Sequence, residues 1–169
     1  MQAPPLTPLA TAVLLVPRRP ERVLAIAADG GEAALFLARE FPAARVRGVD
    51  PSPERVRTAT ERIGLDPEGR VAFKQGRPGA LPFPDAFFDL VAQLDGRPAP
   101  AELARVLTPG GHLVLARTRP ARLPLGLGGQ VPRRRLARHG IELLESTGGG
   151  DGSFAVGRRA SAGPSGNDE

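Results

Sequence analysis

Residues 22–50 read RVLAIAADGGEAALFLAREFPAARVRGVD, and their pattern is the strongest indication of the fold class. The run at 22–28 is compact and apolar, which is typical of a strand buried on both faces. A glycine pair ends it, and residues 32–41 then carry apolar side chains at helical spacing. A second short strand at 44–50 ends in an acid. A strand, a glycine turn, a helix and a second strand predict a parallel unit whose helix packs across the sheet.

The same alternation continues toward the C-terminus. A second helix is expected within 51–64, where Ser52 suits the N-cap, Pro53 takes the first position and Gly64 supplies a stop. The later elements are expected as strands at 70–76, 87–94 and 112–118, a helix at 101–107 closed by the turn TPGG, a basic helix at 132–139, and two last strands at 140–147 and 152–159. The pattern predicts an α/β domain: a doubly wound, mostly parallel sheet with helices on both faces and a C-terminal antiparallel hairpin.

The length and composition of the chain fit one domain. Of its 169 residues 41% are hydrophobic, which is enough for a single core. We expect this domain over residues 21–159, after an N-terminal extension with a short helix at 1–20 and before a disordered polar tail at 160–169. In such sheets ligands bind beyond the carboxyl ends of the strands, where the strand order reverses. Chemistry is therefore expected in the loops after the first, second and fourth strands.

Composition also limits the classes of partner. No cysteine is present, which excludes disulfides and thiolate metal sites and favours a cytoplasmic location. His112 and His139 are too far apart in sequence to suggest a metal centre, and no apolar run is long enough to span a membrane. The formal charge of +5 comes almost wholly from arginine, because Lys74 is the only lysine. This bias is typical of a GC-rich genome, and the lack of Trp and Tyr also makes nucleic-acid binding unlikely; the basic run at 132–139 fits a solvated helix face equally well.

Four segments in register resemble a known family. They read RVLAIAADGGEAALFLA at 22–38, VRGVDPSPERV at 46–56, VAFKQGRPGALPFPDAFFDLV at 71–91 and ELARVLTPGGHLVLAR at 102–117. In order and spacing they resemble the class I S-adenosylmethionine-dependent methyltransferases of the small-molecule type. The resemblance implies a Rossmann-like fold, S-adenosyl-L-methionine as the cofactor, and methyl transfer to an unidentified small-molecule acceptor.

The resemblance also implies cofactor contacts after the second and third strands. Asp50, followed by Pro51, stands where the family has the acid that accepts both ribose hydroxyls. A helix-capping or turn aspartate is the alternative interpretation. After the third strand the family has a Gly-Asp pair whose acid accepts from the adenine amino group, and here Gly76 is followed by Arg77. Because a guanidinium has no acceptor, that contact cannot be made in the usual way. Arg77 either stacks on the adenine or points into water.

The glycine loop departs from the family pattern. The family form is D-x-G-x-G-x-G, and here those places are Ala25, Ala27, Asp29 and Gly31, with Gly30 at a free position. Such a loop lets the backbone approach the cofactor closely, and the helix behind it offers unpaired N–H groups. The family's acid is missing and two of its three glycines are replaced. Asp29 either accepts from the cofactor's ammonium group or caps the following helix.

The segment that would shape the substrate pocket is short, and the sequence leaves several classes of function open. Only DGRPAPA at 95–101 stands where relatives carry a longer loop, and Asp95 and Arg97 are either acceptor-site residues or ordinary loop residues. Methyl transfer depends on orientation more than on a general base, and the chain has no triad or phosphate loop, so no catalytic residue is assigned. The alternative to a methyltransferase is a catalytically inactive methyltransferase-like scaffold in protein interaction or regulation. Another nucleotide-binding α/β domain is a third candidate.

Overall fold

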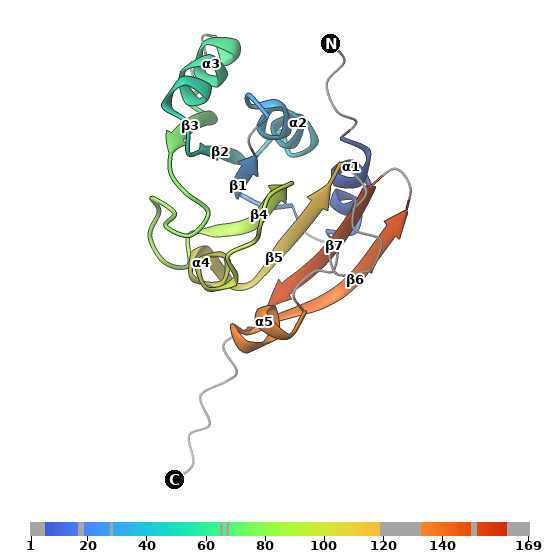
Figure 1. The fold of residues 1–169 in the computed structure, drawn as a ribbon. Coiled ribbons are helices and arrows are strands. Elements are labelled where there is room, and N and C mark those ends of the chain that lie inside the picture. Colours follow the sequence, from blue (N-terminus) through green and yellow to red (C-terminus); the bar gives the residue numbers. More distant parts are fainter. Residues whose placement is uncertain are drawn as a thin grey trace.

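The computed structural model describes residues 6–16, 19–27, 29–64, 66, 68–118, 133–149 and 152–161. Its strands are β1 (Arg22–Ala27), β2 (Arg45–Asp50), β3 (Val71–Gln75), β4 (Phe88–Leu94), β5 (Leu107–Arg117), β6 (Ile141–Gly149) and β7 (Gly152–Arg159). They form a seven-stranded sheet in the order β3-β2-β1-β4-β5-β7-β6 (Figure 1). Strands β1 to β5 pair in parallel, and β7 is antiparallel to both β5 and β6. The fold class predicted from the sequence is confirmed.

Helices cover both faces of this sheet. They are α1 (Thr7–Val13), α2 (Glu32–Glu40), α3 (Pro53–Ile63), α4 (Pro100–Val106) and α5 (Arg133–Arg138). Because successive side chains of a strand point to opposite faces, Val23 joins the apolar cluster that holds Leu37 of α2. Its neighbour Leu24 joins the cluster that holds Leu103 of α4. Figure 1 shows α1 and α2 on one side of the sheet and α4 and α5 on the other.

The ends of α3 follow the sequence signals. Ser52 is its N-cap, and the Ser52 Oγ accepts a hydrogen bond from the backbone N–H of Arg55 at 3.3 Å. Pro53, whose ring fixes a helical φ, takes the first position. The helix stops at Gly64, whose φ of 65° lies in the left-handed region. These boundaries place the first turn of α3 directly after the carboxyl end of β2.

The TPGG segment lies inside β5 rather than between a helix and a strand. Helix α4 ends at Val106, and the expected helix at 101–107 is therefore shifted by one residue. Phe88 of β4 pairs with Leu107, but the next paired residue of β4 pairs with His112, so residues 108–111 loop out of the ladder. A Cβ at Gly111 would lie 2.9 Å from the carbonyl oxygen of Thr108. The tight loop therefore requires glycine at that position.

Arg105 fastens the segment before β4 to α4. Its Nη2 donates to the carbonyl oxygen of Leu81 at 3.0 Å, and its Nη1 donates to the carbonyl oxygen of Phe83 and to Asp85, both at 2.8 Å. Glu102 accepts from the same guanidinium at 2.8 and 2.9 Å and from the backbone N–H of Leu81 at 2.7 Å. The guanidinium holds the pKa of Glu102 below its ordinary value of 4.5. The two most family-like stretches of the sequence are thus bound to each other.

Asp89 ties the amino ends of β4 and β1 together. Its Oδ2 accepts hydrogen bonds from the backbone N–H groups of Glu21 and Arg22, both at 3.0 Å. This edge of the sheet is opposite to the one that carries the glycine loop, so Asp89 has a structural role. Within the described ranges, no helix has both the length and the apolar composition needed to cross a bilayer. The predicted extension at 1–20, domain at 21–159 and tail at 160–169 stay predictions, and residues 1–5 and 162–169 lie outside the described part.

Candidate functional site

The reversal of strand order falls at β1, which lies between β2 and β4. Ligands of doubly wound sheets bind at such a point, beyond the carboxyl ends of the strands. A small cavity of about 10 Å³ lies there and is lined by several of the predicted cofactor residues. These are Ala25, Ala27, Asp29, Gly30, Gly31 and Asp50. The structure therefore brings together the two loops that the sequence singled out, although the space between them holds about one water molecule.

The glycine loop needs both of its glycines. Gly30 has a φ of 71° and Gly31 a φ of 94°, a region where side chains other than glycine are strained. A Cβ on Gly31 would also lie 2.8 Å from the ring of Phe73. The loop is further held from α3, because Arg62 forms an ion pair with Glu32 at 2.5 Å. The backbone conformation of the two glycines therefore fixes the turn at the start of α2, and the exposed ion pair adds little.

Asp29 caps α2. Its Oδ1 accepts from the backbone N–H of Gly31 at 3.0 Å, and its Oδ2 accepts from that of Ala33 at 2.8 Å. Of the two interpretations left open by the sequence, the geometry favours capping. Burial raises the pKa of Asp29 despite these two bonds. The carboxylate thus takes two of the N–H groups that a helix N-terminus otherwise offers to an anionic ligand.

Asp50 is a buried carboxylate that already has partners. It is the last residue of β2 and is 4% exposed. Its Oδ1 accepts from the backbone N–H of Ser52 at 2.7 Å, and its two oxygens accept from Nε of Arg55 at 3.0 and 2.8 Å. The bond to Ser52 fits the turn-aspartate interpretation, and the position at the end of β2 fits ribose binding. A ligand hydroxyl at Asp50 would share the carboxylate with Arg55 or displace it, and the Arg55 side chain is 47% exposed.

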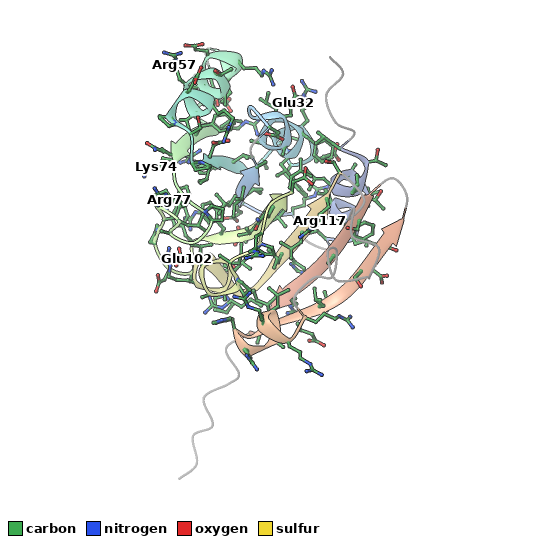
Figure 2. The ribbon with its side chains drawn as sticks, viewed as in Figure 1. Glu32, Arg57, Lys74, Arg77, Glu102 and Arg117 are labelled. Carbon is green, nitrogen blue, oxygen red and sulfur yellow. The ribbon has the colours of Figure 1, made fainter. Side chains whose placement is uncertain are left out.

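The remaining predicted cofactor residues lie on the same edge but differ in exposure. Gly76 donates its N–H to the carbonyl oxygen of Asp50 at 3.1 Å, and a Cβ there would lie 2.6 Å from the ring of Pro82. The carbonyl oxygen of Pro51 accepts from Gln75 at 3.2 Å. Arg77 is exposed, at the outer edge of the molecule in Figure 2, and its backbone pairs with Ala80 across a tight turn. Gly76 thus lies next to the end of β2, while the side chain of Arg77 lies at the surface.

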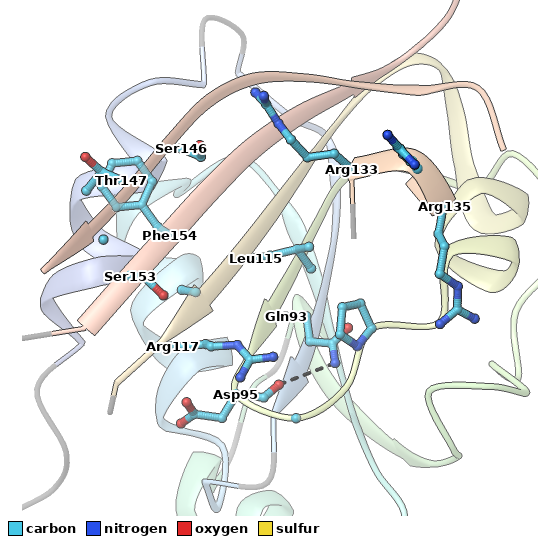
Figure 3. A pocket seen from close by; sticks show the side chains of 15 residues that line it. Gln93, Asp95, Leu115, Arg117, Arg133, Arg135, Ser146, Thr147, Ser153 and Phe154 are labelled. Carbon is cyan, nitrogen blue, oxygen red and sulfur yellow. Dashed lines mark hydrogen bonds between the residues drawn. The ribbon is translucent and has the colours of Figure 1, made fainter. Parts of the chain in front are cut away.

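A second and larger cavity, of about 860 Å³, opens beyond the carboxyl ends of β4 and β5. Figure 3 shows Gln93 and Leu115 in its centre, with Arg133 and Arg135 on one side and Phe154 on the other. Gln93 and Leu115 are direct partners in the β4–β5 ladder and therefore share a face of the sheet. Because Leu94 of β4 pairs with Ala27 of β1, this cavity is one strand away from the glycine loop.

Asp95 and Arg97, the two loop residues that the sequence offered for the acceptor site, lie at different positions relative to the larger cavity. Asp95 lines the larger cavity, but its Oδ1 accepts from the N–H of Thr118 at 3.0 Å and its Oδ2 from the hydroxyl of Thr118 at 2.8 Å. Its φ of 57° marks a tight turn, which favours the interpretation as a loop residue. Arg97 is exposed and lines neither of the two cavities described here. His112 is buried inside β5.

The residues that the sequence analysis missed are Arg55 and Gln93. Arg55 follows the predicted ribose acid by five positions, and its place in the first turn of a capped helix was the available signal. Gln93 lies inside an apolar strand, where a lone amide is an unusual residue. It is 3% exposed, its Nε2 donates to the carbonyl oxygen of Asp95 at 3.3 Å, and within the described part of the chain its Oε1 accepts no hydrogen bond.

These features define a doubly wound α/β domain with a small cavity at its switch point and a larger open cavity beside it. The profile of the methyltransferase domain family matches residues 23–111, and the chain belongs to this family. A demethylmenaquinone methyltransferase of Thermus thermophilus is 37% identical over 130 residues, which are 71% of this chain and 56% of that protein. The chain thus spans about half the length of the curated relatives it matches.

Solved structures share the fold at low sequence identity. A chain from the complex of the Haloferax volcanii Trm112 methyltransferase activator with a methyltransferase superposes with a TM-score of 0.74 at 19% identity, covering 92% of this chain and 90% of that one. The cyclase SpnF superposes with a TM-score of 0.70 at 21% identity, covering 92% and 80%. Because one of these proteins is named for a different reaction, the fold by itself does not fix the chemistry.

Proposed function

We propose that this chain binds S-adenosylmethionine at the carboxyl ends of β1 and β2 and transfers its methyl group to a small-molecule acceptor. The observation that carries the proposal is the buried carboxylate of Asp50 beside the left-handed turn at Gly30 and Gly31. An acid at this place can accept both hydroxyls of a ribose, and glycines let a ligand approach the backbone. Relatives named as methyltransferases of quinones and other small molecules add support.

The residues present fit this cofactor in part. Asp50 and the glycine turn supply the ribose acceptor and the close backbone approach, but the cavity between them is only about 10 Å³. It opens by moving Arg55, and an ion pair with a half-exposed arginine gives way easily because water solvates the released guanidinium. The family's first acid is absent at Ala25, so nothing there holds the cofactor's ammonium group. We therefore expect binding that is real but weaker than in relatives with the full loop.

The protein's own residues would position both reactants. When bound, the cofactor supplies an electrophilic sulfonium methyl group. Asp50 would accept the ribose hydroxyls, and the backbone at Gly30 and Gly31 would lie against the bound molecule. The larger cavity at the end of β4 would hold the acceptor, since Leu94 and Ala27 are ladder partners and the two cavities are therefore adjacent. Orientation of this kind is the main contribution an enzyme makes to such a displacement.

One observation favours a second candidate, a catalytically inactive scaffold. Asp29 takes two N–H groups at the start of α2, and Arg55 takes both oxygens of Asp50, so the groups expected to bind a cofactor are satisfied internally. A chain retained for protein interaction or regulation would show this closed arrangement. Cytoplasmic location and weak affinity for nucleic acid remain predictions under either function.

Calorimetric titration with S-adenosylmethionine and S-adenosylhomocysteine separates the two candidates. The proposed function predicts saturable one-to-one binding that Asp50→Ala weakens by about 1.5–3 kcal/mol, or roughly tenfold to 150-fold, because charge-assisted hydrogen bonds are lost. Glu61→Ala is the matched control, since Glu61 is an exposed acid later on α3. No binding by a wild-type sample that circular dichroism shows to be folded would overturn the proposal in favour of the scaffold.

A further inference from the structure

The larger cavity has a strongly uneven charge. Its described lining includes the arginines Arg117, Arg133, Arg134 and Arg135, and Asp95 is the one carboxylate among those residues. Both oxygens of Asp95 are engaged by Thr118 across the β4–β5 edge, so this carboxylate is held at one border of the cavity. Three of the arginines come from a single short helix, α5, that stands over the open face of the sheet. The opening is therefore positive and faces a ligand entering from solvent.

The floor of the cavity is mixed in character. Leu115 of β5 presents apolar surface beside Gln93, on the face of the sheet that α4 and α5 cover. Phe154 of β7 is the ladder partner of Ala116 and lines the cavity from the opposite face. Gln93 is the exception, because it is almost fully buried and its Oε1 accepts no hydrogen bond within the described residues. A buried carbonyl without a donor is destabilising, and in native proteins such groups usually have a partner such as a ligand or a bound water. Its place in the lining of the cavity puts this unused acceptor where an entering hydroxyl or amine can reach it once it displaces the covering atoms.

The cavity also has the size and place of an acceptor site. A volume of about 860 Å³ lies within the range of small-molecule pockets, about 300–1,000 Å³. Gln93 and Leu115 face the side of α4 and α5, next to the end of β4 that pairs with β1. An acceptor bound in this cavity therefore has one end at the arginines and the other near the glycine loop.

We infer that this cavity takes a small anionic acceptor, an apolar body with a carboxylate or phosphate at one end and a hydroxyl or amine at the other. The inference rests on the proposed methyltransferase function. The arginines of α5 bind the anionic end, because guanidinium groups pair bidentately with carboxylate and phosphate. Leu115 contacts the body, and Gln93 Oε1 accepts a hydrogen bond from the hydroxyl or amine. The cavity thus selects its acceptor by the charge of the arginines at its rim and by one hydrogen bond to Gln93 at its floor.

The test uses probes of equal shape and different charge, without any S-adenosylmethionine present. 4-Hydroxybenzoate, 4-hydroxybenzamide and 4-hydroxyphenyl phosphate are titrated into the full chain and binding is followed by NMR. We expect the benzoate to bind at least tenfold more tightly than the benzamide, and this preference to fall severalfold in the double variant Arg133→Gln, Arg135→Gln. Arg138→Gln is the matched control, since Arg138 is on the same helix and outside the cavity lining. 4-Hydroxyphenyl phosphate distinguishes a phosphate-selective site from a carboxylate-selective one, and tight binding of either anion supports the inference.

Gln93→Met provides an independent readout. It removes the unused acceptor at similar volume, so we expect benzoate and benzamide to lose affinity by the same severalfold factor, because the contact they share is the hydroxyl group. A purely structural role for Gln93 would change the midpoint of unfolding and leave both affinities unchanged. Equal or absent binding of the benzoate, or an Arg138→Gln effect as large as that of the double variant, would overturn the inference. Tighter binding of a uridine dodecamer than of the benzoate would also overturn it, in favour of nucleic acid. Because no cofactor is present, these results do not depend on whether the proposed function holds.

Discussion

Replacing Arg105 with alanine should destabilise the fold without changing any residue in the loops after β1 and β2. In the wild type, the 30% exposed side chain of Arg105 donates hydrogen bonds to the carbonyl oxygens of Leu81 and Phe83 and two to the carboxylate of Glu102. The alanine variant loses all of these bonds. Bonds that involve a charged group contribute about 1.5–3 kcal/mol when their partner is left buried, and less where water can replace them. The contact with Asp85, which is 79% exposed, adds about 0–1 kcal/mol. We therefore expect Arg105→Ala to lower the free energy of unfolding by about 2–4 kcal/mol.

Urea unfolding followed by far-ultraviolet circular dichroism is the assay, since the chain has no Trp or Tyr to report by fluorescence. Arg105→Lys keeps the charge but not the planar fork, so it should recover less than half of the loss. Arg57→Ala is the control, because the ion pair of Arg57 with Glu61 is exposed and its loss should change stability by less than about 0.5 kcal/mol. A loss below about 1 kcal/mol for Arg105→Ala, or full recovery by lysine, would refute the structural role assigned to this side chain.

Three other substitutions test side chains that form hydrogen bonds within the protein. Asp29→Gly should lower the free energy of unfolding by about 0.5–2 kcal/mol through the lost cap, yet strengthen S-adenosylhomocysteine binding, whereas weaker binding would identify Asp29 as a cofactor contact. Arg55→Met frees both oxygens of Asp50 and should tighten cofactor binding in calorimetry; an unchanged affinity would show that the ion pair does not compete. Since the folded-state pKa of Glu102 is lowered, its ionised form stabilises the fold above pH 4.5, and this stabilisation is lost as the pH falls through the lowered pKa. The stability difference between wild type and Glu102→Gln should therefore shrink on acidification, and a constant difference would contradict the assigned ion pair with Arg105.

The sequence was enough to predict the elements of the fold, because their signals are local. Apolar runs with glycine at their ends predicted the strands, and Ser52, Pro53 and Gly64 predicted the limits of α3. The TPGG segment was recognised as a turn, but its place within β5 depends on pairing with β4, which only the folded sheet defines. The contacts of Arg105 join residues about twenty positions apart, so two motifs that looked separate in the sequence are one unit.

The position of the candidate site could be predicted from the sequence, but the hydrogen bonds of its side chains could not. Asp50 and the glycine loop meet at one cavity because parallel strands end at the same edge. Whether Asp29 caps a helix or contacts a ligand depended on the direction of its carboxylate, which the sequence left open. The ion pair of Arg55 with Asp50 depends on how the first turn of α3 folds back over β2, and the unpaired Oε1 of Gln93 depends on every group around it. Such side-chain states follow from packing rather than from spacing.

If a cofactor binds where the loops after β1 and β2 meet, NMR titration of the ¹⁵N-labelled chain with S-adenosylhomocysteine should locate it. We expect the largest shifts at the backbone amides of Gly30, Gly31, Asp50 and Ser52, while the amide of Arg138 on the far side of the sheet does not shift. Saturation of those amides together would support the proposed site. Shifts confined to other elements, or none in a folded sample, would contradict it.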